Sequence, residues 1–444
     1  MENEVKTISM REVNRLALPA ILSGIAEPVI ALIDTAFIGH LGTEALGGIG
    51  IGSSLFVLFV WVLTQVKTAI SAIVSRHYGA GTLNDIRSLI PQVLYSVILL
   101  GLIVFLLTDY FSIQLLQLYS AQGEVLDQAD KYFSIRSIGF PIALCTFTIF
   151  GIFRGLQNTL WAMYISIGGG LLNVILDILL IYGVEGVIPP LYIEGAAWAS
   201  LMAQCAMLIA SCIILIKKTS FSLIAKLPFH GEFRNVLSLS SGFIVRTLAL
   251  NLTFFLANRF ATGYGNAYIA AHTIAVNIWL FSSYFIDGYA NAGNALSGRL
   301  LGSGNTKELY RMAMRLMKLS IGIGAVLSLI YLCLYPWIGQ VFSDDPTVIS
   351  LFESIFWIVV LAQPINAIAF SLDGIFKGLG DARYLMVTLL WASFAGFLPI
   401  LFLGDALSWK IYGIWAAFMV FMAIRGGSLL WKLRRVYGSS DERG

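Results

Sequence analysis

The chain has 444 residues, of which 58% are hydrophobic and 12% are charged, and its net charge is +3. A soluble domain of this length could not bury so much apolar surface, so the composition excludes a soluble globular protein and predicts an integral membrane protein. We expect no nucleic-acid partner.

Apolar runs recur along the whole chain, each about 20 residues long, which is the length at which an α-helix crosses a bilayer core. The runs are apolar on both parities, whereas the strands of a membrane barrel alternate. We therefore predict an all-α membrane protein with twelve transmembrane helices. The predicted spans cover residues 16–38, 47–70, 88–108, 133–153, 161–182, 195–216, 237–260, 268–296, 314–334, 349–376, 384–403 and 411–431.

Charged residues divide between alternate connections. Lysine and arginine lie before the first span and after the second, sixth, eighth, tenth and last spans, whereas acids gather in the other connections. By the positive-inside rule, both termini are cytoplasmic. The first apolar run is too long for a cleavable signal and leads into further spans, so we expect a multi-pass protein of the cell (inner) membrane.

The chain contains an internal repeat. The stretch PIALCTFTIFGIFRGLQNT begins at Pro141, and PINAIAFSLDGIFKGLGDA begins at Pro364, 223 residues later. The same offset relates other pairs: Gly42 and Gly265, Arg76 and Arg299, Gly79 and Gly302, Gly81 and Gly304. The turns RHYGAG and GRLLGSG suit helix ends that reverse with positive φ, and we assign them no ligand.

Six spans per repeat is an even number, so both copies enter the membrane in the same direction. We expect two six-helix bundles, residues 1–216 and 237–444, joined by a cytoplasmic linker at 217–236. A pseudo-twofold axis along the membrane normal should relate the bundles. Two equivalent bundles leave a cleft that either side can open, which suggests alternating access.

Two acids lie inside the predicted spans at similar depth. Asp34 and Asp177 each precede the outer end of an outward-running span by four or five residues, and Asn173 lies one turn before Asp177 on the same face. An ionisable group in a span costs about 2.5–3.5 kcal/mol on insertion scales, which favours a functional role. Two close carboxylates favour retention of a proton by one of them, and hard oxygen ligands also suit Na⁺. We predict a cation-coupling site at these three residues; the alternative is acids that snorkel to the headgroups.

Other charges in the spans are second-rank candidates. Glu27, two turns earlier in the first span, is either a second station for a proton or a buried, hydrogen-bonded acid. Arg246 and Asp287 lie at the same depth in neighbouring spans, and we expect them to pair, either for structure or for transport. Asp373 and Lys377 are four residues apart and should form a local salt bridge.

No enzyme is expected. The four cysteines lie inside apolar spans without CxxC spacing, so we expect neither disulfides nor thiolate metal sites. The chain also lacks the spacing of a nucleophile and base or of a metal-ligand set. We expect no cofactor besides H⁺ or Na⁺ as the coupling ion.

The first-span stretch LIDTAFIGHLGTEALGGIGIG and the paired GIFRGLQNT and GIFKGLGDA segments resemble the multidrug and toxic compound extrusion (MATE) family. The tenth-span stretch SLDGIFKGLGD resembles its DNA-damage-inducible (DinF-like) branch. The resemblance implies an antiporter of antibiotic resistance that exports amphipathic, often cationic compounds as H⁺ or Na⁺ flows inward. It also implies that Asp34, Asn173 and Asp177 form the cation site, and that the first helix bends near Pro19 when the site is protonated.

This sequence departs from the family pattern in two places. The sixth-span threonine that completes the Na⁺ site of some members is absent, because EGAAWAS has Ala196 or Ala197 there, and the repeat equivalent of Asp34 is Ala257. We therefore expect H⁺ rather than Na⁺, bound in the N-terminal half alone. The expected partners are small amphipathic or cationic drug-like compounds and membrane lipids, and we expect a monomer.

Two other functions are alternatives. A lipid-linked precursor flippase of the same superfamily would need a strongly cationic central cleft, and apart from Arg246 the predicted spans offer few inward cations. A membrane scaffold or receptor without transport activity would leave the buried acids unexplained.

Overall fold

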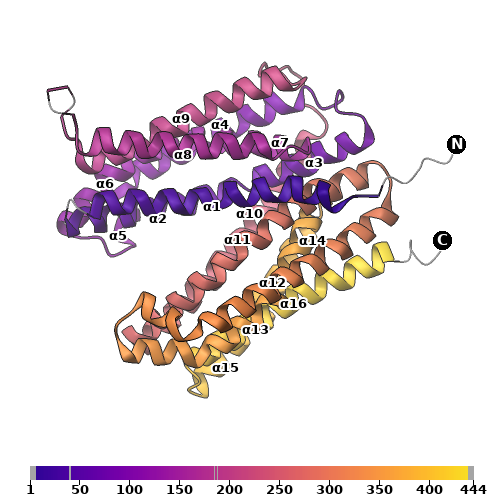
Figure 1. The fold of residues 1–444 in the computed structure, drawn as a ribbon. Coiled ribbons are helices and arrows are strands. Elements are labelled where there is room, and N and C mark those ends of the chain that lie inside the picture. The colour runs from indigo at the N-terminus through magenta and orange to yellow at the C-terminus, as the bar shows by residue number, and fades with distance from the viewer. Residues whose placement is uncertain (1–6, 40–41, 185, 188, 439–444) are drawn as a thin grey trace. The chain divides into compact units, whose positions relative to one another are not determined.

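The computed structural model describes residues 7–39, 42–184, 186–187 and 189–438 and, within them, all side chains except those of residues 26–32, 34–36, 39 and 336. The described residues form helices and no β-strand (Figure 1). The helices are α1 (Met10–Gly39), α2 (Thr43–Leu63), α3 (Val66–Ala80), α4 (Leu89–Tyr110), α5 (Ser112–Gln117), α6 (Gly123–Ser137), α7 (Gly139–Gly155), α8 (Leu160–Ile181), α9 (Tyr192–Lys218), α10 (Phe233–Tyr264), α11 (Asn266–Gly302), α12 (Thr306–Phe342), α13 (Pro346–Gly378), α14 (Ala382–Trp391), the π-helix η1 (Ala392–Phe397), α15 (Leu398–Ala406) and α16 (Ile411–Tyr437).

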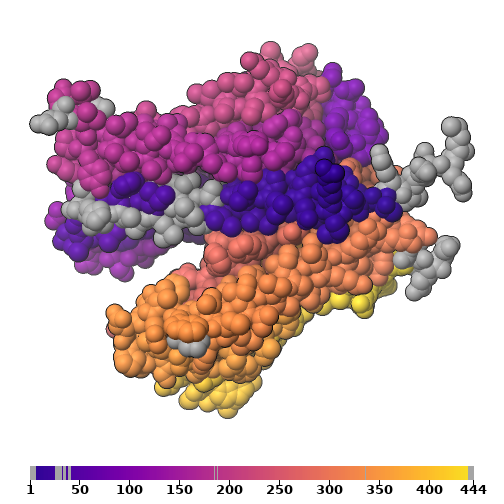
Figure 2. Space-filling view, viewed as in Figure 1, coloured from indigo at the N-terminus to yellow at the C-terminus, as the bar shows by residue number. Residues whose placement is uncertain are grey.

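The predicted membrane architecture is confirmed. In the described part of the chain, 10 helical stretches are long and apolar enough to cross a membrane, and the bent pair of α6 and α7 makes up to 11. With α1 before them, they agree with an all-α membrane protein of twelve helices. The helix surfaces are apolar where lipid would lie: Leu329 and Trp337 of α12 are 62% and 60% exposed. Figure 2 shows the surface of the segment that contains α12 and α13 in orange.

The fourth predicted span is bent, because proline interrupts it. α6 and α7 meet at Ile138 with an angle of 49°. Pro141 has no N–H to donate, and in a straight helix its ring would collide with the carbonyl of Ser137. A Cβ added at Gly101 would lie 2.4 Å from Cα of Pro141, so α4 packs directly against this bend.

The described residues form two compact units. One comprises residues 22–77 and 81–240, and the other comprises residues up to Ile21, 78–80 and those from Ser241 onward. α1 contributes to both, since its first part packs in the second unit and its part from Leu22 packs in the first unit. The division falls two residues after Pro19.

The 223-residue repeat recurs in the helix contacts of the two units. In α7, a Cβ added at Gly151 would lie 2.3 Å from the carbonyl oxygen of Lys67 in α3. In α13, a Cβ at Gly374 would lie 2.2 Å from the carbonyl oxygen of Ala290 in α11. Each partner of the second contact is 223 residues after its counterpart. Glycine at these positions lets one helix backbone touch the next.

The predicted positive-φ turns are confirmed. Gly81 has a φ of 73° and Gly304 a φ of 72°. Gly42 and Gly265, at the N-caps of α2 and α11, have φ values of 134° and 122°. The repeat therefore preserves backbone conformation as well as residue type.

Candidate functional site

α1 and α8 lie side by side within the unit of residues 22–77 and 81–240 (Figure 1). The hydroxyl of Ser23 donates a hydrogen bond to the hydroxyl of Ser166 at 3.0 Å. Toward the other end, the hydroxyl of Tyr182 donates one to the carbonyl of Phe37 at 2.8 Å. These two contacts determine the register of α1 against α8.

This register brings the backbone of the predicted cation site to one level. The contacting residues differ by 143 positions at one contact and 145 at the other, so the backbone at residue 34 lies level with residues 177 to 179. Asp34 and Glu27 belong to α1, but their side chains lie outside the described residues. The structure therefore describes the α8 half of the predicted site.

Polar side chains line the inner face of α8, whereas its outer face is aliphatic. Leu171 and Ile175 are 63% and 55% exposed, but Asn173 and Asp177 are 4% and 0% exposed. This inverted pattern is expected for a helix in a bilayer, where an apolar solvent drives polar groups inward. The Nδ2 atom of Asn173 is buried and makes no hydrogen bond with a described residue.

Methyl groups surround the end of α8 that follows Asp177. Ala196 and Ala197 of α9 are buried in one cluster with Ile181 of α8. A Cβ added at Gly195 would lie 2.5 Å from the carbonyl oxygen of Leu180, so the two helices touch here. Ala196 and Ala197 therefore provide no hydroxyl ligand for a cation at this level of α9.

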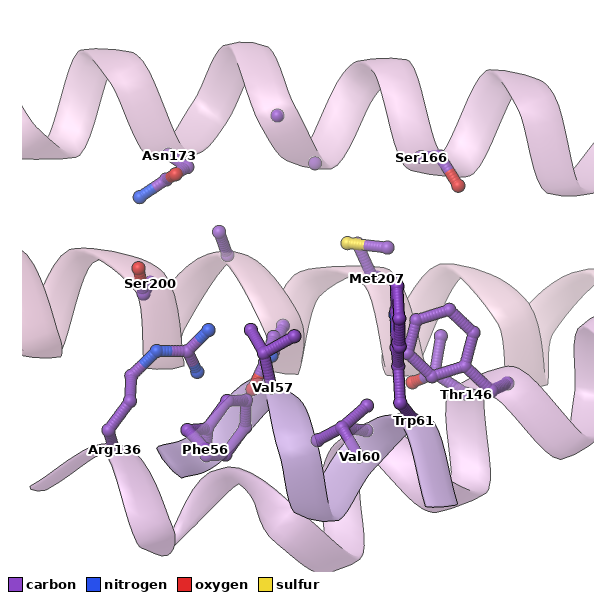
Figure 3. Close-up of a pocket in the computed structure, with 16 residues that line it drawn as sticks. Phe56, Val57, Val60, Trp61, Arg136, Thr146, Ser166, Asn173, Ser200 and Met207 are labelled. Atoms are coloured by element: carbon purple, nitrogen blue, oxygen red, sulfur yellow. The ribbon is translucent and has the colours of Figure 1, made fainter. Parts of the chain in front are cut away.

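A cavity of about 210 Å³ opens beside Asn173. Figure 3 shows Asn173 and Ser166 pointing into it from α8, while Arg136 and Phe56 lie on the opposite wall. Five helices line it with apolar, aromatic and a few polar side chains: Phe56, Val57, Val60 and Trp61 of α2, Arg136 of α6, Ala143, Thr146 and Phe147 of α7, Ser166, Gly169, Gly170 and Asn173 of α8, and Ser200, Ala203, Gln204 and Met207 of α9. Such a mixture is typical of a small-molecule site.

Arg136 is the cation of this cavity, and the sequence analysis missed it. Its guanidinium lies over the ring of Phe56, 4.1 Å from the centroid. Nε and Nη1 are buried without a hydrogen-bond partner among the described residues, and the same holds for Oε1 of Gln204. Arg136 lies inside the predicted span 133–153, so the rule on charges in spans that singled out Asp34 would also have found it.

A second polar cluster lies in the unit that contains residues from Ser241 onward. Asp373 of α13 forms ion pairs with Arg246 of α10 at 2.6 Å, with Lys377 at 2.8 Å and with Arg425 of α16 at 3.6 Å. The predicted bridge between Asp373 and Lys377 is confirmed. The predicted pairing of Arg246 with Asp287 is wrong: Asp287 is exposed on α11 and forms no ion pair with a described residue.

The reason for this correction is geometric. Equal depth in two spans does not determine which side chains face each other. The guanidinium of Arg246 contacts Asp373 of α13 instead of Asp287. Arg425 was not singled out from the sequence, although it lies within the predicted span 411–431.

Comparison with known proteins identifies the family. The profile of the MatE family matches residues 19–179 and 243–400, which is more than half of the chain. The chain belongs to the MatE family.

Similar proteins support this MatE assignment. Protein DETOXIFICATION 44, chloroplastic, of Arabidopsis thaliana is 29% identical over 440 residues, which is 95% of this chain and 82% of that protein. DNA damage-inducible protein F of Escherichia coli (strain K12) is 27% identical over 438 residues, 96% of this chain and 93% of that protein. The predicted DinF-like resemblance is thereby confirmed.

A solved structure has the same fold. The crystal structure of MATE in the bent conformation has a TM-score of 0.90 and 18% sequence identity, covering 98% of this chain and 96% of that chain. As a MatE member, the chain is a multi-pass membrane protein and a multidrug efflux transporter of drug-like compounds, and it is not an enzyme.

Proposed function

We propose that the chain is an H⁺-coupled antiporter that exports amphipathic compounds, including cationic ones, by alternating access. One observation carries the proposal: Asn173 lines the cavity beside α8, and Asp177 lies buried one helical turn away. Protonation of Asp177 therefore changes the electrostatic potential that acts on a compound in the cavity. The backbone of Asp34 in α1 lies level with residues 177 to 179 of α8, so a second acid belongs to the helix segment at the same depth.

In the proposed cycle, the outward-facing protein takes up a proton on the pair of Asp34 and Asp177. Neutralising these carboxylates removes the desolvation penalty of their charges and weakens the attraction of a cationic substrate. α1 repacks near Pro19, the substrate leaves outward, and the proton is released to the cytoplasm. Coupling requires only that proton and substrate disfavour each other by about 1–3 kcal/mol.

The chemistry around α8 supports H⁺ rather than Na⁺. Na⁺ requires several oxygen ligands, whereas a proton requires one basic oxygen. Ala196 and Ala197 present methyl groups beside the end of α8, so α9 supplies no hydroxyl from these positions. Asp177 with Asn173 and Asp34 is a sufficient set for a proton.

The test is dye efflux from proteoliposomes under an imposed pH gradient and, separately, under a Na⁺ gradient. We expect the wild type to transport a fluorescent cationic dye on the pH gradient, and Asp34→Asn and Asp177→Asn to lose this transport, since an amide takes up no proton. Glu124→Gln, an exposed acid at the start of α6, is the control and should match the wild type. Transport by both variants at the wild-type rate, or transport on the Na⁺ gradient alone, would overturn the assignment.

A flippase for lipid-linked precursors is the second candidate, and one observation favours it. Arg246, Lys377 and Arg425 form a cationic cluster around Asp373, of which the sequence predicted only the bridge between Asp373 and Lys377. Two acids, Asp373 and Asp287, offset most of that charge, which ranks this function second. Reconstitution with a fluorescent lipid-linked pyrophosphate discriminates the two, because a flippase moves that lipid across the bilayer and an exporter of small compounds does not.

A further inference from the structure

The last turns of α16 carry three cations, and a described acid neutralises only one of them. The ammonium of Lys432 pairs with the carboxylate of Asp381 and lies over the ring of Tyr384, 3.9 Å from its centroid. Arg434 and Arg435 are exposed, and neither forms an ion pair with a described residue. Two neighbouring guanidinium groups of this kind are suited to bind a phosphate.

Both arginines line a groove of about 460 Å³ on the surface of α16, which we call the α16 groove. Gly427, Leu430 and Trp431 complete its lining. The other four residues follow Gly427 at offsets of three, four, seven and eight positions, so all five lie in one stripe along the helix. The guanidinium of Arg435 lies over the ring of Trp431, 5.1 Å from the centroid, and this contact holds the cation at the groove.

The hollow at Gly427 lies on the open face of α16. A Cβ added there would meet no atom within 4 Å, whereas a Cβ added at Gly426 would lie 3.4 Å from the side chain of Ile368 in α13. The side of Gly426 therefore packs against the protein, and the side of Gly427 does not. Trp431, one turn further on, is 56% exposed. Because α16 is long and apolar enough to cross a membrane, its open face meets lipid.

The α16 groove changes from apolar to cationic along the helix axis. Gly427 and Arg434 are seven residues apart, which corresponds to about 10 Å along an α-helix. The positive-inside rule predicts that this end of α16 is cytoplasmic, which places the arginines among the headgroups and Gly427 deeper, beside acyl chains. Trp431 lies between them, at the level where tryptophan is enriched in membrane proteins. This order matches a phospholipid, whose phosphate lies outside its hydrocarbon.

We propose that the α16 groove is a binding site for one anionic phospholipid of the cytoplasmic leaflet. The phosphate pairs with Arg434 and Arg435, and an acyl chain fills the hollow at Gly427. The two cations favour an anionic lipid over a zwitterionic one, because the latter carries a cation of its own beside the phosphate. None of the five residues lines the cavity beside α8, so the proposal depends neither on the coupling ion nor on the exported compound.

The test uses the full chain in phosphatidylcholine vesicles that contain a small fraction of brominated phosphatidylglycerol or, separately, of brominated phosphatidylcholine. Bromine quenches tryptophan fluorescence on contact, and subtracting the signal of Trp431→Phe isolates that of Trp431. We expect brominated phosphatidylglycerol to quench Trp431 at a roughly tenfold lower mole fraction, because two arginines face its anionic headgroup. The double variant of Arg434→Gln and Arg435→Gln should lose this preference.

Two further variants separate the site from general attraction to a basic surface. Lys217→Gln combined with Lys218→Gln removes two cations from the last turn of α9, so it lowers the net charge equally and should keep the preference. Gly427→Leu fills the hollow from a position where an added Cβ meets no atom. It should reduce the preference several-fold although both arginines remain.

The proposal is overturned if wild type shows no headgroup preference, if the arginine variant or Gly427→Leu keeps the full preference, or if the lysine variant loses it as well. Relief of quenching by inorganic phosphate at constant ionic strength would also overturn it, because the groove would then take a free phosphate. The same holds if neither brominated lipid quenches Trp431, since another protein chain would then cover the groove.

Discussion

Asp373 and Arg136 show two ways in which this chain holds a charge inside an apolar lobe. Asp373 is 4% exposed and is surrounded by the three cations Arg246, Lys377 and Arg425. Arg136 has an aromatic ring beneath it and no described acid beside it. A buried charge that is paired supports the structure, whereas one without a protein partner is available to a ligand.

At this scale we predict that Asp373→Asn destabilises the protein severely. Removing the carboxylate leaves three cations facing each other, and loss of one partner of a buried ion pair costs about 3–5 kcal/mol. Asp381→Asn is the matched control, because Asp381 pairs with Lys432 at a partly exposed site, where a bridge contributes about 0–1 kcal/mol.

The measurement is the thermal unfolding temperature in detergent. A small decrease for Asp373→Asn, equal to that of the control, would show that the cluster around Asp373 is hydrated and adds little to stability.

At the scale of elements, close glycine contacts position the helices within each unit. Gly151 lets α7 touch α3, and Gly374 lets α13 touch α11 at the equivalent place in the repeat. Within a bilayer, apolar side chains gain little by leaving lipid, so close packing across small residues contributes much of the attraction between helices. The repeat retains glycine at this helix contact in both units.

We accordingly predict that Gly151→Ala and Gly374→Ala each lower stability by about 1–3 kcal/mol, because the added methyl group overlaps a carbonyl oxygen of the neighbouring helix. Gly168→Ala in α8 is the control. Its Cβ would meet no atom within 4 Å, and alanine should stabilise the helix by up to about 1 kcal/mol.

Thermal unfolding of the three variants checks this prediction. It would fail if the contact glycines tolerated alanine as well as Gly168 does.

At the scale of the whole molecule, α1 is held on both sides of Pro19. Its first turn is tied by the ion pair of Glu12 with Arg299 at 2.6 Å, inside one unit. Its later part is tied by Ser23 to Ser166, inside the other unit. Pro19 lies between these attachments and leaves the carbonyl of Arg15 without its helical N–H partner. α1 is thus weakest between the two points at which it is held.

We predict that Pro19→Ala slows H⁺-driven efflux several-fold without lowering thermal stability. Alanine restores the missing hydrogen bond and stiffens α1, so a bend that accompanies protonation becomes less favourable. Binding of the fluorescent cationic dye in detergent should be unchanged, since Pro19 does not line the cavity beside α8.

Initial efflux rates and dissociation constants of wild type and Pro19→Ala provide the comparison. An unchanged rate would remove bending at Pro19 from the cycle.

The membrane spans and the repeat could be predicted from the sequence, because properties of neighbouring residues determine both. The length of each apolar run predicted the spans, and the 223-residue offset predicted paired glycines whose contacts and positive φ values recur in both units. The bend at Ile138 was not predicted. Pro141 alone could not predict it, because the equivalent Pro364 lies inside an unbroken α13. Proline permits a bend, and the surrounding packing decides whether it occurs.

The candidate site was predictable in part. Spacing along one helix placed Asn173 and Asp177 on one face, and α8 buries both. Spacing could not reveal that Arg136 and Gln204, from α6 and α9, share a cavity with Asn173. Nor could it reveal that Arg246 reaches Asp373 instead of Asp287.

By itself, the sequence determined that this is a duplicated, all-helical membrane transporter with acids in its first and fifth spans. Hydrophobic length, helical period and the conformational demands of glycine are properties of neighbouring residues, and they can be read along the chain. Only the tertiary structure decided which charges from different helices meet and which one is left facing a cavity, because those distances depend on how helices rotate and pack against one another.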